Sequence, residues 1–455
     1  MDDKTIAAIA TAQGQGGVGI IRISGEKAFD IADKVFTSTS GKRPHNMPGY
    51  TASFGHVLDE NGNSLEAIML VFKKPHSYTG EDVVEISCQG GVYVTKSILR
   101  AILDNGAYPA EAGEFTKRAF LNGKMDLLEA ESVMNIISAK NKTALKAANS
   151  VLEGKLGKRL SSVKEDLLTV AAHLSAWADY PEDEIPAVNE EEIFDAVDKA
   201  ANVLQTLIDE CDRGRALTEG IDTVIVGKPN VGKSTLMNML SGSERSIVTD
   251  IPGTTRDIVE DTVNLGNYTL HLSDTAGIRF TDDIIEKIGV DKALDKINTG
   301  ELILAVFDGS GKLSKEDKHL IDKISNYNCV AIINKSDLPQ IIDQDYITQK
   351  IPFVVYTSAI SQEGADKLIS ALDDIFSAGA FNPGEGILAG ERQRSTALSA
   401  LEALIEARAS LQAGYTLDAV TVSIEFAIQE LLSLTGERAT EEIVNKVFER
   451  FCVGK

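Results

Sequence analysis

The sequence feature that most constrains the fold is an eight-residue stretch near the middle of the chain. Residues 227–234 read Gly-Lys-Pro-Asn-Val-Gly-Lys-Ser, which matches the phosphate-loop pattern G-x-x-x-x-G-K-S. The stretch follows an apolar run typical of a strand, 223–226, and precedes a helical run, 235–240. In such a loop the backbone N–H groups and the helix N-terminus wrap phosphate groups, so the loop needs a strand before it and a helix after it. The pattern therefore predicts a nucleotide-binding α/β domain, and an ordinary glycine-rich turn is the less favoured interpretation.

Residues of this loop also have specific uses in nucleotide hydrolysis. Lys233 would neutralise the oxygens of the β- and γ-phosphates, which makes it a candidate catalytic residue. The hydroxyl of Ser234 would bind Mg²⁺. The residues expected to contact the phosphates are Asn230, Val231, Gly232, Lys233, Ser234 and Thr235.

Further motifs follow in the order that a GTPase requires. Asp-Thr-Ala-Gly at 274–277 follows an apolar run; its Asp would reach Mg²⁺ through water, and Gly277 would donate its N–H to the γ-phosphate. Asn-Lys-Ser-Asp at 334–337 follows another apolar run, and a carboxylate at Asp337 can accept hydrogen bonds from N1–H and N2–H₂ of guanine together. Adenine does not present that pair of donors, so the motif favours GTP over ATP. The residues assigned to these contacts are Asp274, Thr275, Ala276, Gly277, Asn334, Lys335 and Asp337, with Ser358 and Ala359 closing over the base.

The segment 248–257 between these motifs reads Val-Thr-Asp-Ile-Pro-Gly-Thr-Thr-Arg-Asp and suits a switch loop. A threonine in such a loop can complete the Mg²⁺ shell while the γ-phosphate is present and let go after hydrolysis, and we assign this role to Thr255. Simple loop chemistry is the alternative interpretation. The residues of the segment expected near the nucleotide are Thr249, Asp250, Ile251, Pro252, Gly253, Thr254 and Thr255.

One residue that many GTPases use is missing. Ile278 follows the 274–277 motif at the position where a glutamine commonly orients the attacking water. Either hydrolysis is slow, or another residue orients the water. The candidates are the carboxylates Asp282, Asp283 and Glu286, which on physical grounds alone also fit a solvated helix face.

Composition limits the class of protein. The 455 residues include 45 Lys and Arg against 68 Asp and Glu, a formal net charge of −23, which excludes nucleic-acid binding by bulk electrostatics but not by a local basic patch. No run of 18 apolar residues occurs and the N-terminus lacks a signal-peptide layout, so we expect no transmembrane segment and a cytoplasmic location. Four widely separated cysteines argue against a disulfide framework or a zinc ribbon: Cys88, Cys211, Cys329 and Cys452.

The texture of the sequence indicates a multi-domain protein of α+β and α/β class. Residues 1–118 mix β-rich runs with glycine-rich turns, which predicts an α+β domain, and 119–215 show helical periodicity. Residues 216–379 alternate strands and helices, and helical periodicity returns in 380–455, so we predict an all-α domain interrupted by a Ras-like P-loop domain with a parallel sheet. Strands are expected at 19–23, 67–72, 83–86, 223–226, 269–273, 302–307, 330–333 and 353–356. The helical stripes include Leu156, Leu160, Val163, Leu167, Val170 and Leu174, then Ile193, Val197, Ala200, Leu204, Leu207 and Cys211, and later Leu398, Leu401, Leu404 and Ile405.

These motifs, together with both ends of the chain, resemble the MnmE (TrmE) family of tRNA-modification GTPases. The similarity covers essentially the whole chain. It includes the opening at 6–25, the stretches 77–85 and 113–124, and the ending Phe-Cys-Val-Gly-Lys at 451–455. The chain departs from the family pattern at four places, namely Ala12 for Pro, Gln89 for the His of a His-Gly-Gly turn, Glu111-Ala112 for Arg-Pro, and Gln393 for the His of an Arg-His pair.

The resemblance implies an N-terminal dimerisation domain that binds 5-formyl-tetrahydrofolate or a related one-carbon folate. Arginine and lysine suit the carboxylates of that ligand, and glutamate suits its pterin-like donor edge. Taken alone, each of these residues would fit an ordinary surface charge. The matching positions are Arg22, Glu85, Lys124 and Lys455.

The resemblance also implies K⁺ as a catalytic cation, which would supply the positive charge that an arginine finger gives in other GTPases. Glu286 matches the carboxylate that orients the attacking water. Cys452 matches a residue proposed to act in the modification chemistry, although no base neighbours it in sequence. The positions that match the K⁺ ligands are Asn230, Thr249, Ile251 (through its backbone) and Thr254.

The implied activity is that of a K⁺-stimulated GTPase that forms a homodimer and is activated when its GTPase domains dimerise. With a FAD-containing GidA/MnmG partner it would install a carboxymethylaminomethyl-type group at C5 of the wobble uridine of certain tRNAs. Two alternatives remain: an Era-like ribosome-assembly GTPase, which lacks the 451–455 ending, and a non-catalytic nucleotide switch, which Ile278 would suit. Candidates for a local tRNA-binding surface, or equally for a solvated face, are Lys117, Arg118, Lys124, Lys140, Lys142 and Lys146.

Overall fold

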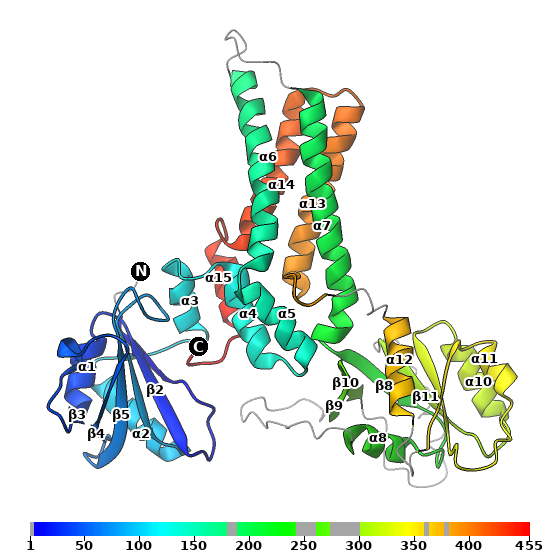
Figure 1. Cartoon of the computed structure of the whole chain (residues 1–455), viewed down its shortest axis with the longest axis horizontal. Coiled ribbons are helices and arrows are strands. Elements are labelled where there is room, and N and C mark those ends of the chain that lie inside the picture. Colours follow the sequence, from blue (N-terminus) through cyan, green and yellow to red (C-terminus); the bar gives the residue numbers. More distant parts are fainter. Residues whose placement is uncertain (1–3, 180–188, 243–260, 274–300, 359–363, 377–381) are drawn as a thin grey trace.

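The computed structural model of the chain describes residues 4–179, 189–242, 261–273, 301–358, 364–376 and 382–455. Within them the chain forms an N-terminal region built on one sheet, a helical region, and an α/β region (221–376) inserted into the helical region (Figure 1). The long helices stand side by side, and the N-terminal and α/β regions lie near the same end of this bundle, on opposite sides (Figure 1). This arrangement confirms the predicted multi-domain fold class.

The N-terminal region is a seven-stranded sheet with two helices on one face. The strand order is β3-β4-β5-β6-β2-β1-β7, and the pairs are antiparallel except β1 with β7, which is parallel. The elements are β1 (Ile6–Ile9), β2 (Val18–Ser24), α1 (Ala28–Val35), β3 (Phe36–Ser38), η1 (Pro44–Asn46), β4 (Thr51–Leu58), β5 (Ser64–Phe72), β6 (Val83–Gln89), α2 (Val92–Asp104) and β7 (Tyr108–Pro109).

Alternation along the strands decides which sheet face carries the helices. In β2, Ile21 and Ile23 are fully buried in one cluster with residues of α1 and α2, so Arg22 between them projects from the opposite face. On that opposite face Phe54 and Ile68 sit directly across from each other on β4 and β5, and they are 51% and 44% exposed. Within the described residues this second face of the sheet therefore carries a partly exposed apolar surface.

The predicted strands of this region lie inside β2, β5 and β6, but four other strands were missed, namely β1, β3, β4 and β7. Strand β4 shows why, because it contains Gly55, a residue that weakens strand patterns. A Cβ at Gly55 would lie 2.2 Å from the carbonyl oxygen of Thr37 on β3. The close approach of β3 and β4 thus requires glycine at position 55, where a residue typical of strands would have made β4 recognisable in the sequence.

The helical region is a bundle whose core is the predicted set of apolar stripes. Helix α13 packs against both α7 and α14, and α6 packs against α7 and α14. The predicted stripes lie almost entirely in this core, but Ile405 is 54% exposed while its neighbour Leu404 is fully buried. The inclusion of Ile405 was wrong, since one residue step turns a helix by about 100° and carries the side chain away from the core. The helices are α3 (Glu114–Leu121), α4 (Leu127–Ser138), α5 (Lys142–Leu152), α6 (Lys155–Asp179), α7 (Glu190–Thr218), α13 (Glu391–Gln412), α14 (Leu417–Thr435) and α15 (Glu441–Phe448).

The α/β region is a six-stranded sheet in the order β13-β12-β11-β8-β10-β9, parallel except for the β9–β10 pair. All five predicted strands are present, and β9 was missed. Separate clusters of buried apolar residues cover the two faces, as expected for a parallel sheet between helices. The elements are β8 (Ile221–Val226), α8 (Lys233–Gly242), β9 (Asp261–Leu265), β10 (Tyr268–Ser273), β11 (Leu302–Asp308), α10 (Lys315–Ile324), β12 (Cys329–Asn334), α11 (Gln344–Thr348), β13 (Phe353–Tyr356) and α12 (Ala365–Ile375).

Two connections hold the regions together. The C-terminal tail returns to the N-terminal region, where Val453 forms a β-bridge with Ala112 and the backbone N–H of Phe115 donates to the carbonyl of Lys455 at 3.2 Å. Helices α3 and α7 run across the predicted domain limits at 118/119 and 215/216, so the backbone passes between regions without a loop at these points. None of the helices in the described part of the chain is long and apolar enough to cross a membrane.

Candidate functional site

The phosphate-loop motif lies between β8 and α8, which begins at Lys233. Gly227 and Gly232 have positive φ angles of 143° and 100°, and Asn230 is a non-glycine residue with a φ of 62°. A Cβ at Gly227 would lie 2.4 Å from the carbonyl oxygen of Val306, and one at Gly232 would lie 2.0 Å from Nδ2 of Asn334. Backbone conformation and close packing thus both require glycine at these two positions, and asparagine is among the few other residues that tolerate the conformation of position 230.

The side chain of Lys233 folds back onto the phosphate loop. Its Nζ donates to the carbonyl oxygens of Gly227 (2.6 Å) and Lys228 (2.7 Å), and its partial burial lowers the pKa of the ammonium group. The next two residues of the helix, Ser234 and Thr235, are exposed. The loop therefore presents one half-buried cation and two accessible hydroxyls at a helix N-terminus, a donor set that fits a phosphate group with a bound Mg²⁺.

The second nucleotide motif begins at the end of β12 and is joined to the phosphate loop through Asn334. This side chain is buried, and its Nδ2 donates to the carbonyl of Val231 at 2.9 Å. Asp337 accepts a hydrogen bond from the hydroxyl of Ser358 at 2.9 Å, so the carboxylate assigned to guanine lies beside the second residue after β13. The structure thus brings together the predicted residues of three separate motifs at the carboxyl ends of β8, β12 and β13.

Lys335 completes this side of the site. Its ammonium forms an ion pair with Asp308 at the end of β11, at 2.5 Å. Burial alone would raise the pKa of Asp308, but the hydrogen bonds from Lys335 and Ser310 outweigh it and hold the pKa below its usual value. A pocket of about 270 Å³ lies between the phosphate loop and the end of β11, lined by Lys228, Asn230, Phe307, Asp308, Lys335 and Ile342 among others.

Several predicted site residues lie outside the described residues and stay predictions. They are Thr249, Asp250, Ile251, Pro252, Gly253, Thr254, Thr255, Asp274, Thr275, Ala276, Gly277, Glu286 and Ala359. Across the described ranges, three or more His, Cys, Asp or Glu side chains nowhere gather to hold a metal ion.

A second cluster of predicted residues lies on the face of the N-terminal sheet that is opposite to helices α1 and α2. Arg22 and Glu85 sit opposite each other on β2 and β6 and form an ion pair at 2.8 Å. The guanidinium of Arg22 also lies 5.3 Å from the ring centre of Tyr78 and 5.5 Å from that of Phe115, and it donates to the carbonyl of Gly454 at 3.4 Å. The structure therefore joins two of the predicted folate residues to two aromatic rings and to the C-terminal tail.

The other two predicted folate residues flank this cluster. Lys124 donates to the carbonyl of Pro75 at 3.1 Å, at the start of the loop that carries Tyr78, and Lys455 is held through its backbone to Phe115. Sequence reasoning did not single out Tyr78 or Phe115, although both lie inside stretches that carry the family resemblance.

Cys452 differs from the other three cysteines in its accessibility. It is exposed, whereas Cys88, Cys211 and Cys329 are buried, and burial raises the pKa of the Cys211 thiol to about 11 and that of Cys329 to about 12. A thiol that stays protonated is a poor nucleophile. Among the four cysteines, Cys452 is therefore the accessible one.

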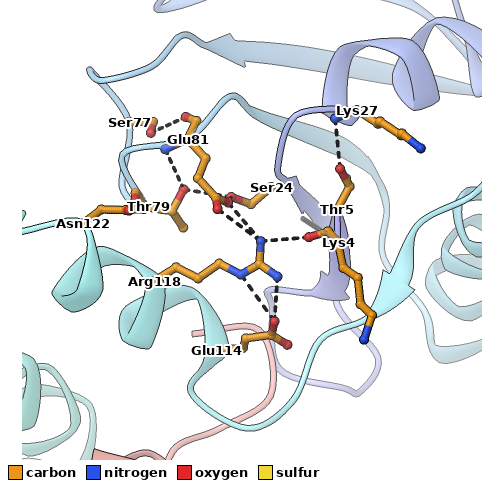
Figure 2. A network of polar contacts seen from close by, with 10 residues as sticks. All are labelled: Lys4, Thr5, Ser24, Lys27, Ser77, Thr79, Glu81, Glu114, Arg118 and Asn122. Atoms are coloured by element: carbon orange, nitrogen blue, oxygen red, sulfur yellow. Dashed lines mark hydrogen bonds and ion pairs between the residues drawn. The ribbon is translucent and has the colours of Figure 1, made fainter. Parts of the chain in front are cut away.

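Arg118, proposed as part of a basic surface, belongs to an internal network (Figure 2). Its guanidinium forms ion pairs with Glu81 at 3.2 Å and Glu114 at 2.7 Å and donates to the carbonyl of Lys4, and its side chain is 12% exposed. Glu81 in turn accepts from the hydroxyl of Ser24 at 2.6 Å. Arg118 thus ties α3 to β2 and to the loop before β6, and the assignment of this residue to a tRNA-binding surface was wrong.

Comparisons with known proteins match the chain from end to end. A family model described as "GTP-binding protein TrmE N-terminus" matches residues 5–124, and one described as "MnmE helical domain" matches residues 127–452. The tRNA modification GTPase MnmE of Clostridioides difficile (strain 630) is 40% identical over 457 residues, which cover 100% of this chain and 99% of that protein. The protein of the same name from Thermoanaerobacter pseudethanolicus is 39% identical over 456 residues, with 99% of each chain covered. Among solved structures, the G domain of the FeoB iron transporter of T. maritima is 25% identical and covers 34% of this chain and 98% of its own, with a TM-score of only 0.26.

Proposed function

The chain belongs to the MnmE family, and from this membership together with the site geometry we propose a specific function for it. It is a GTP-hydrolysing enzyme of tRNA modification that uses GTP and Mg²⁺. Within that activity we propose that it acts in the cytoplasm with a FAD-containing GidA/MnmG-type partner to install a carboxymethylaminomethyl-type group at C5 of the wobble uridine of certain tRNAs. The Era-like alternative is not favoured, because the matches include the N-terminal region and the C-terminal segment.

The observation that carries the proposal is the joining of Asp337 and Ser358 to the phosphate loop through the buried side chain of Asn334. A carboxylate held in this position can accept from two donors of guanine, and a site built on such hydrogen bonds strongly rejects a base that lacks them. In this arrangement Lys233 and Ser234 would meet the β- and γ-phosphates. GTP is therefore the nucleotide that this arrangement suits best.

For the hydrolysis step we propose that Glu286 orients the attacking water in place of the glutamine that Ile278 replaces. A bound K⁺ would supply positive charge beside the phosphates. Asn230, at the tip of the phosphate loop, would be one of its ligands, together with Thr249, the backbone of Ile251, and Thr254, while Thr255 and Ser234 would bind Mg²⁺.

Single-turnover hydrolysis in K⁺ and in Na⁺ tests the assignment of the cation site. Replacing Asn230 by Ala should erase the difference between the two salts, because the change removes a ligand of the cation but leaves the nucleotide motifs intact. A variant that still hydrolyses GTP faster in K⁺ than in Na⁺ would remove Asn230 from the site. Equal rates of the unmodified protein in both salts would remove the cation itself.

We also propose a homodimer. The apolar face of the N-terminal sheet around Phe54 and Ile68 supports it, since exposed apolar surface of this kind commonly marks a protein interface. Replacing Ile68 by Asp should shift the protein toward monomer in light scattering, because a charge in an apolar contact is costly. A dimer of unchanged stability would place the interface elsewhere.

The folate site is proposed at Arg22 and Glu85, with Lys124 and Lys455 at its edge. The donor set fits such a ligand: a guanidinium for carboxylates, a carboxylate for a donor-rich ring edge, and the rings of Tyr78 and Phe115 for flat apolar surface. Titration of 5-formyl-tetrahydrofolate into Glu85→Gln should show weaker binding than to the unmodified protein. Unchanged affinity would contradict this placement.

Nucleoside analysis of tRNA tests the whole proposal. A strain that lacks this protein should lose the carboxymethylaminomethyl-type modification of the wobble uridine, and the intact gene should restore it. Restoration by a Lys233→Ala variant would show that GTP hydrolysis is not needed. Unaltered wobble uridine in the deletion strain would contradict the proposed function.

A further inference from the structure

An ion pair joins the phosphate loop, which follows β8, to helix α10, which follows the neighbouring strand β11. Lys228, the second residue of the phosphate-loop motif, places its Nζ 2.7 Å from Oδ2 of Asp317 and 2.9 Å from the hydroxyl of Ser314. Ser314 is the N-cap of α10, and Asp317 lies in the first turn of that helix. The contact therefore joins two segments almost ninety residues apart, one of which binds the nucleotide.

The carboxylate of Asp317 is held rigidly. Its side chain is 7% exposed, and Oδ2 accepts from both the backbone N–H (2.9 Å) and the hydroxyl (3.0 Å) of Ser314. The backbone N–H of Asp317 donates in return to the hydroxyl oxygen of Ser314 at 3.2 Å, which completes a capping box. A carboxylate fixed in this way makes a stationary counter-charge for Lys228, whose own side chain is 34% exposed. Of the two partners, Asp317 is thus the anchor and Lys228 is the group that it positions.

Lys228 is also in direct contact with the phosphate-binding lysine. Its backbone carbonyl accepts from Nζ of Lys233 at 2.7 Å, so a shift of Lys228 would move an acceptor of Lys233. Asn230 lies two residues after Lys228, and its positive φ angle shapes the tip of the loop. A displacement of Lys228 would therefore disturb the backbone of the loop that wraps the phosphates.

The charge balance of the site gives the carboxylate a second effect. The pocket beside the loop is lined by three lysines, Lys228, Lys312 and Lys335, and by two aspartates, Asp308 and Asp317. Asp308 pairs with Lys335 and Asp317 pairs with Lys228, so each of the two nucleotide motifs has its own acidic partner. Without Asp317, the side chain of Lys228 would lack this counter-ion in a partly desolvated pocket, and the loop would be expected to move so that water can reach it.

We propose that Asp317 is a positioning residue for nucleotide binding: through Lys228 it fixes the phosphate loop in the conformation that receives the α- and β-phosphates. The proposal rests on the GTPase activity of the protein and concerns binding rather than the hydrolysis step. Because GDP and GTP share these two phosphates, both nucleotides should depend on Asp317 to the same extent. The proposal therefore predicts a change in KM with little change in kcat.

The test uses the full-length protein with Asp317→Asn, which keeps the shape of the side chain and removes its charge. We expect the KM for GTP and the Kd for GDP to rise about tenfold, with kcat within about twofold of the unmodified value. Lys228→Met should have the same effect, and the double variant should be no worse than either single one, because the two residues act through one contact. Lys228→Arg, which keeps the charge, should bind nucleotide nearly normally.

A matched control lies on the same helix. Asp322 is also on α10 and forms an ion pair with Lys350, but neither residue is among those that line the pocket at the phosphate loop. Asp322→Asn should leave both KM and Kd unchanged. If Asp317 only supported the fold, Asp317→Asn would lower the melting temperature while the folded protein bound GDP normally.

Three outcomes would overturn the proposal. Normal GDP affinity in Asp317→Asn would show that the carboxylate does not position the loop. Additive losses in the double variant would show that Asp317 and Lys228 act separately. If Asp317→Asn does not fold, Lys228→Met tests the proposal alone, because the side chain of Lys228 is more exposed than that of Asp317. Normal nucleotide binding by Lys228→Met would then refute the proposal.

Discussion

In the α/β region the phosphate loop, the Asn334–Asp337 motif and Ser358 each follow a strand of one parallel sheet, and they meet at its carboxyl edge. In the N-terminal region Arg22 and Glu85 lie in the middle of two antiparallel strands, and Arg22 reaches Gly454, which is 432 positions away along the chain. The first site is contained in the inserted region. The second site needs both the N-terminal sheet and the C-terminal tail.

This difference shows for which kind of site sequence motifs are enough to predict that residues lie together. In a parallel sheet the loops at the carboxyl ends of strands gather at one edge, so the order of motifs along the sequence is enough to predict a common site. A cluster on the face of an antiparallel sheet depends on which distant segment covers that face. Residues of the second cluster were predicted from the sequence only through resemblance to a family. No local pattern indicated that these residues lie together.

The largest expected effect separates the two sites directly. Deletion of Cys452–Lys455 should abolish tRNA modification, because it removes the exposed thiol and the tail segment that contacts Arg22 and Phe115. GTP hydrolysis should stay within about twofold, since Phe451, which ends the remaining chain, keeps its place in a buried cluster. Modified uridine in cells that carry only the truncated protein would refute the separation of the two sites.

The next largest effect tests the site of the α/β region. Asp337→Asn should weaken GTP binding by about 10³-fold and should improve binding of the xanthosine nucleotide, whose carbonyl replaces the N2–H₂ donor of guanine. Ser336→Ala serves as the control, because Ser336 donates its backbone N–H to the carbonyl of Thr357, a contact that alanine keeps. An unchanged preference in a competition titration would remove Asp337 from the base site.

A smaller effect concerns hydrolysis and falls on a residue outside the described ranges. Glu286→Ala should lower kcat by about 10²-fold with little change in nucleotide affinity, as expected for loss of a group that orients water. Asp282→Asn and Asp283→Asn, which change the two competing carboxylates, should be much less affected. Near-normal turnover of Glu286→Ala in K⁺ would return this residue to an ordinary solvated helix face.

The smallest effect concerns the joint between the N-terminal and helical regions. Asp126 caps α4, and its pKa is raised to about 6, chiefly by burial and in smaller part by the charges of Glu129 and Glu437. A carboxyl with a raised pKa in the folded state binds its proton more tightly there than when unfolded, so its contribution to stability falls as the pH rises from about 4 to 6. Asp126→Asn keeps the capping oxygen and should raise the free energy of unfolding at pH 7.5 by about 1–2 kcal/mol, with little effect at pH 4.

Urea unfolding at the two pH values measures this effect. Asp212→Asn provides a control of opposite sign, because the hydrogen bond from Arg394 lowers the pKa of Asp212 and its contribution is present at neutral pH. That variant should lose stability at pH 7.5. Equal stability of Asp126→Asn and the unmodified protein at pH 7.5 would show that the carboxyl is better solvated than its place at the helix N-terminus suggests.

Prediction from sequence was most complete where a pattern is local. The parallel strands, the phosphate loop and the long apolar stripes were all recognisable, because each depends on residues close together in the chain. Strand β4 was missed because the close approach of β3 requires glycine at position 55, and Arg118 was misjudged because two of its partners, Glu81 and the carbonyl of Lys4, are brought to it by the fold. The pairing of Lys228 with Asp317 has the same origin, since nothing in either segment indicates the other.

The insertion of the α/β region also sets the order in which the protein can fold during synthesis. Helices α7 and α13 pack together, but the ribosome must make residues 219–390 between them. At 5–20 residues per second this takes roughly 10–35 s. During that time the apolar stripes of α6 and α7 lack the partners that α13 and α14 will provide, so the unfinished bundle leaves apolar surface exposed to water until those helices are made.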